Sequence, residues 1–478
     1  MAMTPEIPTI LYGFIAIVVV VALFYSWTTG KSTEKYFWAE GLQRYSVLVL
    51  SLFLVLFANT VIIVLPAFTA YPFLLSLVAI VFALVLMPIL FGTKILYATK
   101  KVVDKSSSVG KSVLGIHGLV YVGVIQILIY LYIADRVLSE FFAGSNFSIQ
   151  VSIIIAAGIY TLVGGMSAVL FANVVIVAAV VIGLLCMLFF PILTHGSDFA
   201  ILQRLLEESS HLFQMSNMAQ PHALIAWIAL VCLISWLVWF DMGMIHKQSI
   251  IRREALSSRI IAGSGVLAGI ATLIVAFVTN RSSSQFADPT SSTVQILTTV
   301  IAVALLSGVI GLLALSFQTF STLIAVTLYP LVEKNTDGEK QVLVGRLSTV
   351  LIVLLAVLLV FLGKILDKQV VVQYLNFMAI GTMPIVGAYI LALVLNRGIS
   401  GSLVIGLLLG EVYAIIEFYV CNGIVAESLF YSMSIYAVAI ENILATLLFG
   451  MAAVRFNESS IGQRLLLRIG FTRTLVSK

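Results

Sequence analysis

Long apolar runs recur along this sequence from its first residues to its last third. Each run is about 18 to 25 residues long, which lets a helix cross the roughly 30 Å hydrocarbon layer of a bilayer. Hydrophobic residues make up 61% of the 478 positions and charged residues only 10%, too few to cover the surface of a water-soluble protein. We therefore predict an all-α polytopic membrane protein.

The spacing of these runs predicts about thirteen transmembrane helices. Loops rich in Lys and Arg stay in the cytoplasm, and an external N-terminus places 21 of the 26 basic residues on that side. We expect an integral protein of the plasma (inner) membrane with its N-terminus outside and its C-terminus cytoplasmic. The net charge of +5 then reflects topology and contact with the lipid bilayer, and it requires no nucleic acid. The predicted spans are 8–28, 46–70, 73–98, 117–142, 149–163, 167–193, 222–243, 259–279, 296–329, 345–366, 370–396, 400–421 and 428–454.

Several functional classes find no support in the sequence. No glycine-rich phosphate loop of an ATP-driven pump is present. The three cysteines show no metal spacing, and no nucleophile and base converge at one membrane depth. We expect neither an enzyme nor a bound cofactor. A channel has little support, because no filter-like repeat appears.

Four separated stretches resemble landmarks of the sodium/solute symporter family, and they occur in the family's order. They are "EKYFWAEG" (34–41), "IYTLVGGMSAVLFANVVI" (159–176), "FDMGMIHKQSIIRREALSSRI" (240–260) and "STLIAVTLYPLVEK" (321–334). With weaker matches, the resemblance covers residues 34 to about 415. It implies a LeuT-type fold with a five-plus-five inverted repeat, which moves a small organic solute together with sodium.

The resemblance also divides the chain into five parts. They are an extra N-terminal helix with its loop (1–45), a first five-helix repeat (46–193), an external loop with a short helix (194–221), a second repeat (222–396), and two peripheral helices with a basic tail (397–478). Asn59 and Thr60 precede Pro66 in the first core helix. They fit either an unwound midpoint or a lightly kinked helix.

The sequence departs from the family at the expected ion site. The family holds sodium with two adjacent serines on the eighth core helix and with backbone carbonyls of the first, here around Ala58 and Val61. The serine positions read Gly311 and Leu312, and the acidic position of the fifth helix reads Asn173. A hard cation needs several oxygens close around it, so we expect the standard sodium site to be lost or weakened. A relocated site is the alternative, and it would use hydroxyls one helical turn away, Ser307 and Ser316.

A solute pocket is expected where core helices line the central cavity in the family. Its candidates offer hydrogen bonds or aromatic faces to a small polar solute. Two of them, the tryptophans, would equally suit a membrane interface. The candidates are Asn59, Gln126, Tyr130, Trp236, Trp239, Gln318, Thr319, Asn376 and Thr382.

Charged residues inside predicted spans are functional candidates because they are costly to bury in lipid. We expect Asp135 to form a local ion pair with Arg136. Glu411, Glu417 and Glu441 fall in the last two spans, outside the ten-helix core. There they would carry a proton or contact another subunit.

The sequence leaves two alternative functions for this chain. The first is a secondary transporter that works by alternating access and is coupled to H⁺, to Na⁺ at a non-standard site, or to nothing. The second is a solute sensor or accessory membrane subunit that does not transport and acts with a partner membrane or signalling protein. The identity of the solute and the oligomeric state stay open.

Overall fold

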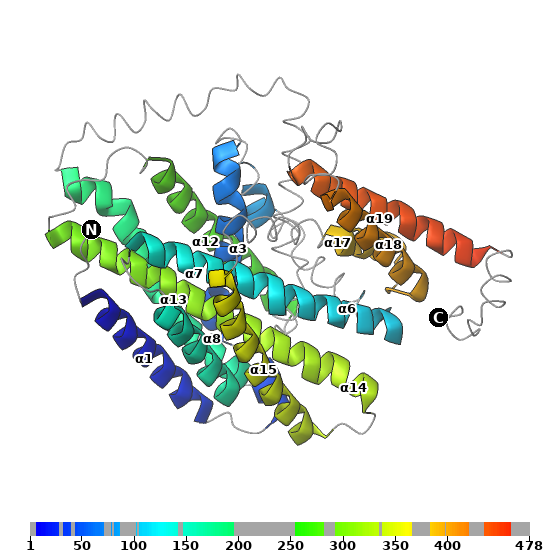
Figure 1. Ribbon diagram of the computed structural model, residues 1–478, viewed down its shortest axis with the longest axis horizontal. Helices are drawn as coiled ribbons and strands as arrows, with labels where there is room; N and C mark the ends of the chain where they lie inside the picture. Colours follow the sequence, from blue (N-terminus) through cyan, green and yellow to red (C-terminus); the bar gives the residue numbers. More distant parts are fainter. Residues whose placement is uncertain are drawn as a thin grey trace, which may run out of the picture.

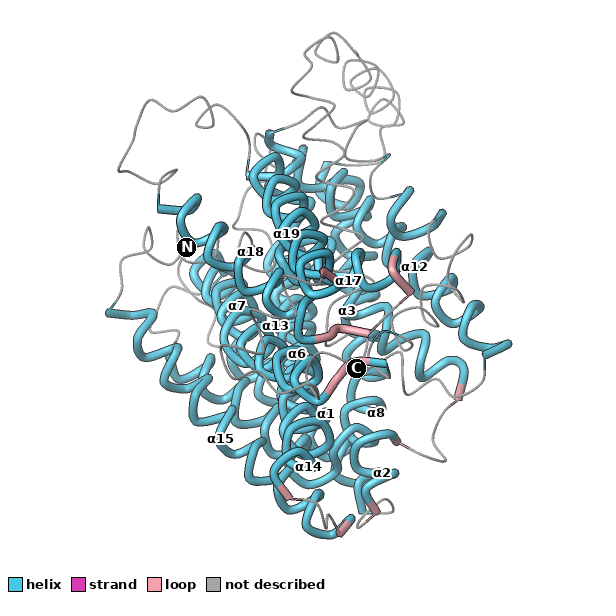
Figure 2. The backbone as a smooth tube through the Cα atoms, turned by 90° about the vertical axis from the view of Figure 1, so that its right-hand side faces the viewer, coloured by secondary structure: helices cyan, strands magenta, loops and turns pink. Residues whose placement is uncertain are grey.

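The computed structural model describes residues 6–27, 32–39, 44–70, 78, 81–86, 102, 105–141, 147–195, 254–281, 292–333, 337–365, 383–396, 398–419 and 435–459. Within these ranges every regular element is a helix (Figure 2). The elements are α1 (Glu6–Trp27), α2 (Thr33–Trp38), α3 (Tyr45–Ala70), η1 (Val81–Leu86), α6 (Ser108–Val120), η2 (Tyr121–Gln126), α7 (Ile127–Phe141), α8 (Phe147–His195), α12 (Glu254–Arg281), α13 (Ser292–Thr322), η4 (Leu323–Leu328), α14 (Tyr329–Val332), α15 (Gly338–Ile365), α17 (Met383–Val394), α18 (Gly401–Tyr419) and α19 (Ile435–Glu458).

The centre of the bundle is α13, which contacts α3, α7, α8 and α15 (Figure 1). Of the residues in its apolar stretch, 89% are buried, against 33% for α15. A helix that is apolar all round suits such a surrounded position, whereas α15 presents one apolar face outward. Helix α1 lies at the edge of the bundle, where Tyr25 stacks on Phe171 of α8 with ring centroids 3.8 Å apart.

The long helix α8 is two helices joined by a sharp turn at Gly165. Gly165 has φ 57° and ψ −145°, a conformation that is essentially restricted to glycine. Tyr160 before the turn donates to the Ile310 carbonyl, while Asn173 after the turn lies against Gly311. A straight helix would separate Tyr160 and Asn173 by about 20 Å. The two arms therefore form a hairpin, which agrees with the two separate spans predicted at 149–163 and 167–193.

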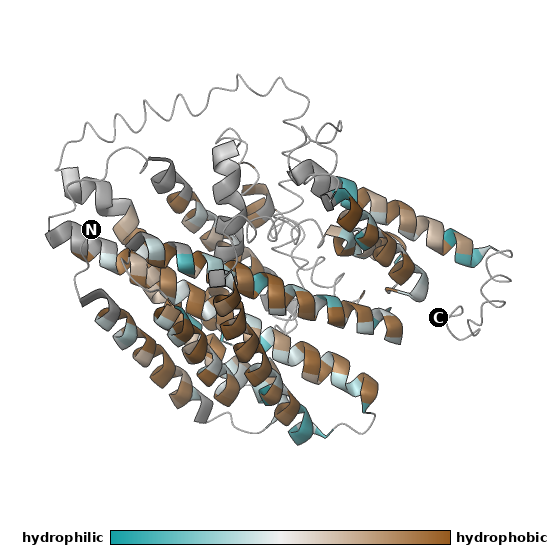
Figure 3. Ribbon diagram, viewed as in Figure 1, coloured by the Kyte–Doolittle hydropathy of each residue, from teal (hydrophilic) through white to brown (hydrophobic). Residues whose placement is uncertain are grey.

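The described helices agree with an integral membrane protein. Four are long and apolar enough to span a bilayer, at residues 108–139, 147–187, 299–332 and 338–363, and shorter apolar helices lie at 9–25, 45–57, 259–275 and 383–394. Hydrophobic colour covers most of the length of the helices (Figure 3). The all-α membrane fold is confirmed, while thirteen spans and the inverted repeat stay predictions.

Helix α3 is helical throughout Tyr45–Ala70. Of the two alternatives for Asn59 and Thr60, this agrees with a continuous helix and not with an unwound midpoint. Two π-helical segments interrupt long helices. Segment η2 lies between α6 and α7, and η4 lies between α13 and α14. Each segment contacts the helix that contains the other's neighbour, α13 for η2 and α6 for η4. There Gly123 of η2 lies against the Phe320 ring, and Gly115 of α6 lies against Leu328. Hydrophobic periodicity does not predict such local widening of a helix.

The last three helices form a separate group, α17–α19, beside the main bundle (Figure 1). Gly406 of α18 lies against the backbone of Gly450, and Gly410 lies against Thr446. Small residues let two helix backbones approach closely. The group meets the bundle where α18 contacts α6.

Candidate functional site

Asn173 on α8 and Gly311 on α13 lie in direct contact. A side chain at Gly311 would place its Cβ 2.8 Å from Asn173 Oδ1, 2.6 Å from Leu54 Cδ2 and 3.2 Å from Ile176 Cδ1. The structure thus brings together the two positions that the family resemblance assigns to one ion site. It surrounds Gly311 with two aliphatic side chains and one amide.

The amide of Asn173 is fully buried, with 0% of its surface exposed. Neither its oxygen nor its nitrogen has a hydrogen-bond partner among the described residues. Leu312, at the second serine position, is also buried and offers no oxygen. The three atoms nearest to a Cβ at Gly311 are two carbons and this one neutral amide oxygen, whereas a hard cation needs several oxygens to replace its water.

Ser307 and Ser316, the candidates for a relocated site, lie at different levels of α13. The hydroxyl of Ser307 donates to the carbonyl of Ala304 within its own helix, at 2.7 Å. Ser316 donates to Gln126 Oε1 at 3.4 Å. Nine residues of helix separate the two serines by about 14 Å, so they cannot share the coordination shell of one ion.

Four of the predicted solute-pocket residues are buried around the middle of the bundle. Gln126 accepts the bond from Ser316. Tyr130 lies one helical turn further along, 2% exposed. Thr319 donates to the carbonyl of Leu315. Gln318 points in another direction, because its Nε2 donates to the Tyr36 carbonyl at 3.1 Å.

The other predicted site residues fall outside the part of the chain whose side chains are described. Helix α3 carries three of them in its second half, where only the backbone is placed. The remainder lie in segments that the structure does not describe. These residues are Ala58, Asn59, Val61, Trp236, Trp239, Asn376 and Thr382.

Gln318 belongs to a polar cluster that the sequence did not predict, centred on Tyr36 of α2. The hydroxyl of Tyr36 donates to the carbonyls of Thr161 and Leu162 at 3.4 and 3.3 Å. Arg346 of α15 lies over the Tyr36 ring, 5.7 Å from its centroid. Burial raises the pKa of Tyr36 to about 12, against smaller opposing effects of its polar neighbours, Thr349 first. Tyr36 was visible in the sequence only as a family landmark.

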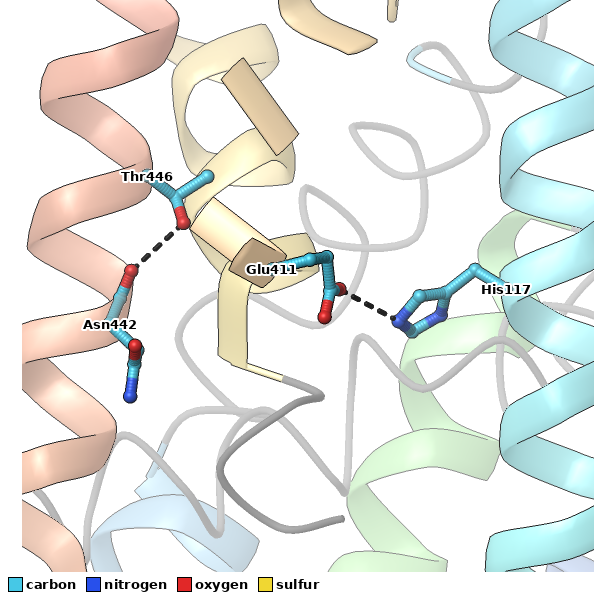
Figure 4. Close-up of polar contacts among 4 residues, drawn as sticks. All are labelled: His117, Glu411, Asn442 and Thr446. Carbon is cyan, nitrogen blue, oxygen red and sulfur yellow. Dashed lines mark hydrogen bonds and ion pairs between the residues drawn. The ribbon is translucent and has the colours of Figure 1, made fainter. Parts of the chain in front are cut away.

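The intramembrane carboxylates make contacts within this chain. Glu411 Oε1 lies 3.5 Å from His117 Nε2 of α6 (Figure 4). Tyr413 donates to Glu441, and Asn442 Nδ2 donates to Glu417 Oε2 at 2.8 Å. These three glutamates therefore link α18 to α6 and α19.

Asp135 accepts a hydrogen bond from Gln150 Nε2 at 3.1 Å, which joins α7 to α8. The side chain of Arg136, its expected ion-pair partner, is outside the described part. Within that part, no group of three or more His, Cys, Asp and Glu residues could hold a metal ion.

A buried central helix, a helical hairpin that turns at Gly165 and polar side chains in the middle of apolar helices characterise the fold of this polytopic membrane protein. One solved structure with this fold is described as the substrate-bound, outward-open state of a Na⁺-coupled sialic acid symporter with a novel Na⁺ site. It matches with a TM-score of 0.73 over 95% of this chain and 98% of that chain, at 12% sequence identity. No protein-family model matches the sequence, and no curated protein matches it. The likeness shows the fold, and membership of the sodium/solute symporter family stays a prediction.

Proposed function

We propose that this chain is a secondary active transporter that moves a small organic solute by alternating access and lacks the standard sodium site. The fold shared with a Na⁺-coupled symporter supports the transport part of the proposal. The observation that carries the second part is the contact between the neutral amide of Asn173 and Gly311. Solute transport is then coupled to protons, coupled to a cation bound at another site, or uncoupled.

The physical argument concerns the cost of removing water from a sodium ion. An aspartate at position 173 and two serines at 311 and 312 would offer a charge and two hydroxyl oxygens. In this chain Leu54 and Ile176 face the same point, and Asn173 carries no charge. An ion placed there would lose its water without replacement, which costs several kcal/mol or more. Helix α3 adds to the argument, because the carbonyls of a continuous helix accept bonds from its own N–H groups.

The solute is proposed to lie beside η2 and α13. Gln126 and Ser316 already form a polar pair there, and Tyr130 and Thr319 lie within one turn of them along the same helices. The aromatic and amide candidates that lie outside the described part, among them Trp236 and Asn376, would complete the lining. A small solute with several hydroxyl, amide or carboxylate groups suits these side chains.

The test begins with a search for the solute. Purified protein is screened by thermal shift against sugars, amino acids, carboxylates and vitamins, with and without sodium. The best stabiliser is then measured for uptake into proteoliposomes in sodium, potassium and choline media. We expect uptake to change by less than about twofold among the three cations. A steep sodium requirement would overturn the proposed loss of the ion site.

The same vesicles separate transport from sensing. A transporter preloaded with unlabelled solute exchanges it for labelled solute across the membrane. Binding in the thermal-shift screen without any such counterflow would contradict the transport proposal and favour a sensor or accessory subunit. The inward contacts of Glu411, Glu417 and Glu441 give no particular support to their use as docking groups for a partner.

A further inference from the structure

The helices α18 and α19 bring two carboxyl groups together. Glu417 of α18 lies within hydrogen-bonding reach of Glu441 of α19. Each carboxyl group also accepts a hydrogen bond from a neutral donor on the other helix. Asn442 Nδ2 of α19 donates to Glu417 Oε2 at 2.8 Å, and Tyr413 of α18 donates to Glu441 Oε1. We call Glu417 and Glu441 the glutamate pair.

Close packing of the two helices keeps the glutamate pair in contact. Gly406 of α18 lies against the backbone of Gly450 of α19. Gly406, Gly410, Tyr413 and Glu417 follow at helical spacing, so they lie along one face of α18. That face is the one packed against α19. The carboxyl groups therefore cannot move far apart without separating the helices.

The surroundings of Glu417 are unfavourable for a negative charge. Glu417 is only 8% exposed, whereas Glu441 is partly exposed. Glu417 Oε1 is buried and accepts no hydrogen bond from the described residues. A carboxylate at Glu417 would therefore carry a buried oxygen without a donor, next to a second carboxylate. Both effects favour the neutral form of the group.

No positive charge in the described helices lies beside the glutamate pair. Helix α18 packs on α6, α17 and α19. His117 of α6 pairs with Glu411, which precedes Glu417 by six residues, about 9 Å of helix. Arg455 follows Glu441 by about 21 Å along α19. The other titratable side chains described on these elements are Lys111, Tyr121, Tyr389 and Glu458.

A proton fits the glutamate pair better than a metal cation does. Asn442 presents its N–H group to the pair and Tyr413 its O–H group, whereas a hard cation is surrounded by oxygen acceptors. Two carboxyl groups in contact cannot both ionise readily. A proton on Glu417 supplies the missing donor, because the acid can donate to Glu441. Glu441 then keeps the charge and the bond from Tyr413.

We propose that Glu417 and Glu441 form a proton-binding site that holds one proton at neutral pH, carried by Glu417, and that this proton joins α18 to α19. Rising pH releases the proton to water and leaves two carboxylates that repel each other across the helices. Glu417 falls near the end of the predicted span 400–421 that the distribution of basic residues places outside. By the family resemblance the pair lies outside the ten-helix core, so its proton is separate from any ion coupled to solute transport.

Infrared spectroscopy of the protein in lipid nanodiscs tests the site, because protonated and ionised carboxyl groups absorb at different frequencies. We expect the difference between wild type and Glu417→Gln at neutral pH to show one protonated carboxyl group per chain. Alkaline pH should remove this signal from wild type. Glu411→Gln is the matched control on the same helix, and it should keep the signal. Loss of the signal in Glu411→Gln would assign the proton to the contact with α6 and overturn the proposal.

Glu441→Gln keeps Glu417 and removes the neighbouring charge. The affinity of Glu417 for its proton should then fall at least about tenfold, so the signal should disappear at a lower pH than in wild type. An unchanged titration would overturn the shared site. So would a wild type with no such signal at neutral pH. A signal that sodium removes at constant pH, when it replaces choline, would show that the pair binds a cation instead.

Thermal unfolding in detergent supplies a second readout. The unfolded chain releases a glutamate proton near about pH 4.3, whereas the folded chain holds this proton to a higher pH. Wild type should therefore lose stability relative to Glu417→Gln as pH rises from about 4.3 to the pH of release, and the difference should be constant above it. A difference that does not depend on pH would contradict the proposal. None of these measurements needs a solute, so the result is independent of the proposed transport.

Discussion

At the scale of single residues, the burial of Asn173 in the described bundle is energetically unfavourable. Its amide is fully buried, and neither of its polar atoms has a partner among the described residues. Leaving such a group unsatisfied costs about 1–3 kcal/mol. A leucine would fit the aliphatic surroundings formed by Leu54 and Ile176 without that cost. We infer that a residue that lowers stability at the centre of the bundle serves a functional role.

Replacing Asn173 with leucine should therefore raise stability and lower activity. We expect Asn173→Leu to stabilise the protein by about 1–3 kcal/mol, because no buried polar atom is left unpaired. Uptake of the solute found in the screen should fall at least about tenfold. Thermal unfolding in detergent and proteoliposome uptake measure the two effects.

Asn442 supplies a matched control for this prediction. It is equally buried, but its amide donates to Glu417. Asn442→Leu should therefore destabilise the protein, because it leaves a buried carboxyl group without its donor. If Asn173→Leu lowers the unfolding temperature as much as Asn442→Leu does, the Asn173 amide has a structural partner and the functional reading is wrong.

Tyr36 predicts a dependence of stability on alkaline pH. The folded chain keeps its hydroxyl neutral up to a pKa of about 12, whereas the unfolded chain releases the proton near pH 10. Proton release between these values favours the unfolded state. The contribution of Tyr36 is thus complete below pH 10 and is lost as pH rises through 12.

Tyr36→Phe cannot ionise, so it isolates this contribution. We expect the difference in unfolding temperature between wild type and Tyr36→Phe to shrink steadily between pH 10 and pH 12. Thermal unfolding of both proteins in detergent across that range measures it. Parallel curves for the two proteins would show that the Tyr36 hydroxyl is not buried as described.

At the scale of elements, the turn at Gly165 determines how α8 and α2 fit together. Alanine there would adopt a strained conformation, at a cost of about 1–3 kcal/mol, and its Cβ would meet the Tyr36 carbonyl. We expect Gly165→Ala to lower the unfolding temperature, because α2 can no longer pack against the turn. Thermal unfolding in detergent measures the effect.

Gly13 on α1 is the control for this substitution. It lies in a helix, and nothing lies within 4 Å of a Cβ added to it. Alanine is favoured over glycine in helices by up to about 1 kcal/mol, so Gly13→Ala should leave stability unchanged or raised. A loss at Gly13 equal to that at Gly165 would mean that the effect is not specific to the turn.

The elements show what the sequence could and could not predict. The break in α8 was predictable, because Gly164 and Gly165 lie between the predicted spans 149–163 and 167–193. The contact of Asn173 with Gly311 agrees with the family resemblance, although the ion site itself stays a prediction. The position of α2 was not predictable, because Tyr36 contacts residues 125 and 282 positions away. No local pattern encodes such contacts.

At the scale of the whole molecule, the described part of the group α17–α19 meets the bundle where α18 contacts α6. Two contacts of this region are the pair between His117 and Glu411 and the backbone contact between Gly110 and Ile399. The side chains of the ion pair are 20% and 25% exposed, so the pair should contribute less than about 1 kcal/mol. The backbone contact leaves no space for a side chain at Gly110 and should matter more.

Two substitutions compare these contributions. Gly110→Leu should destabilise the protein by about 1–3 kcal/mol, because the larger residue forces α6 away from Ile399. Glu411→Gln keeps the shape of the side chain and should cost less than about 1 kcal/mol. Thermal unfolding of the two variants gives the order. A larger loss for Glu411→Gln would show that charge, and not backbone fit, holds this region together.

The whole molecule also sets the limit of reading function from sequence. Hydropathy alone predicted an all-α membrane protein, because a helix needs about 20 apolar residues to cross a bilayer. Hydropathy did not predict that Glu411, Glu417 and Glu441 face neighbours inside the chain. The choice of partner for each glutamate depends on how α18 rotates against α6 and α19, and an apolar run does not specify its rotation.

The α8 hairpin has a consequence for the making of the protein. Both of its arms are completed by α13, which begins roughly 100 residues after α8 ends. At about 5–20 residues per second, a ribosome needs on the order of 5–20 s to synthesise the intervening chain. During that delay the amide of Asn173 is in the membrane without the helix that buries it. Newly made copies therefore carry the hairpin without its main packing partner until the later helix arrives.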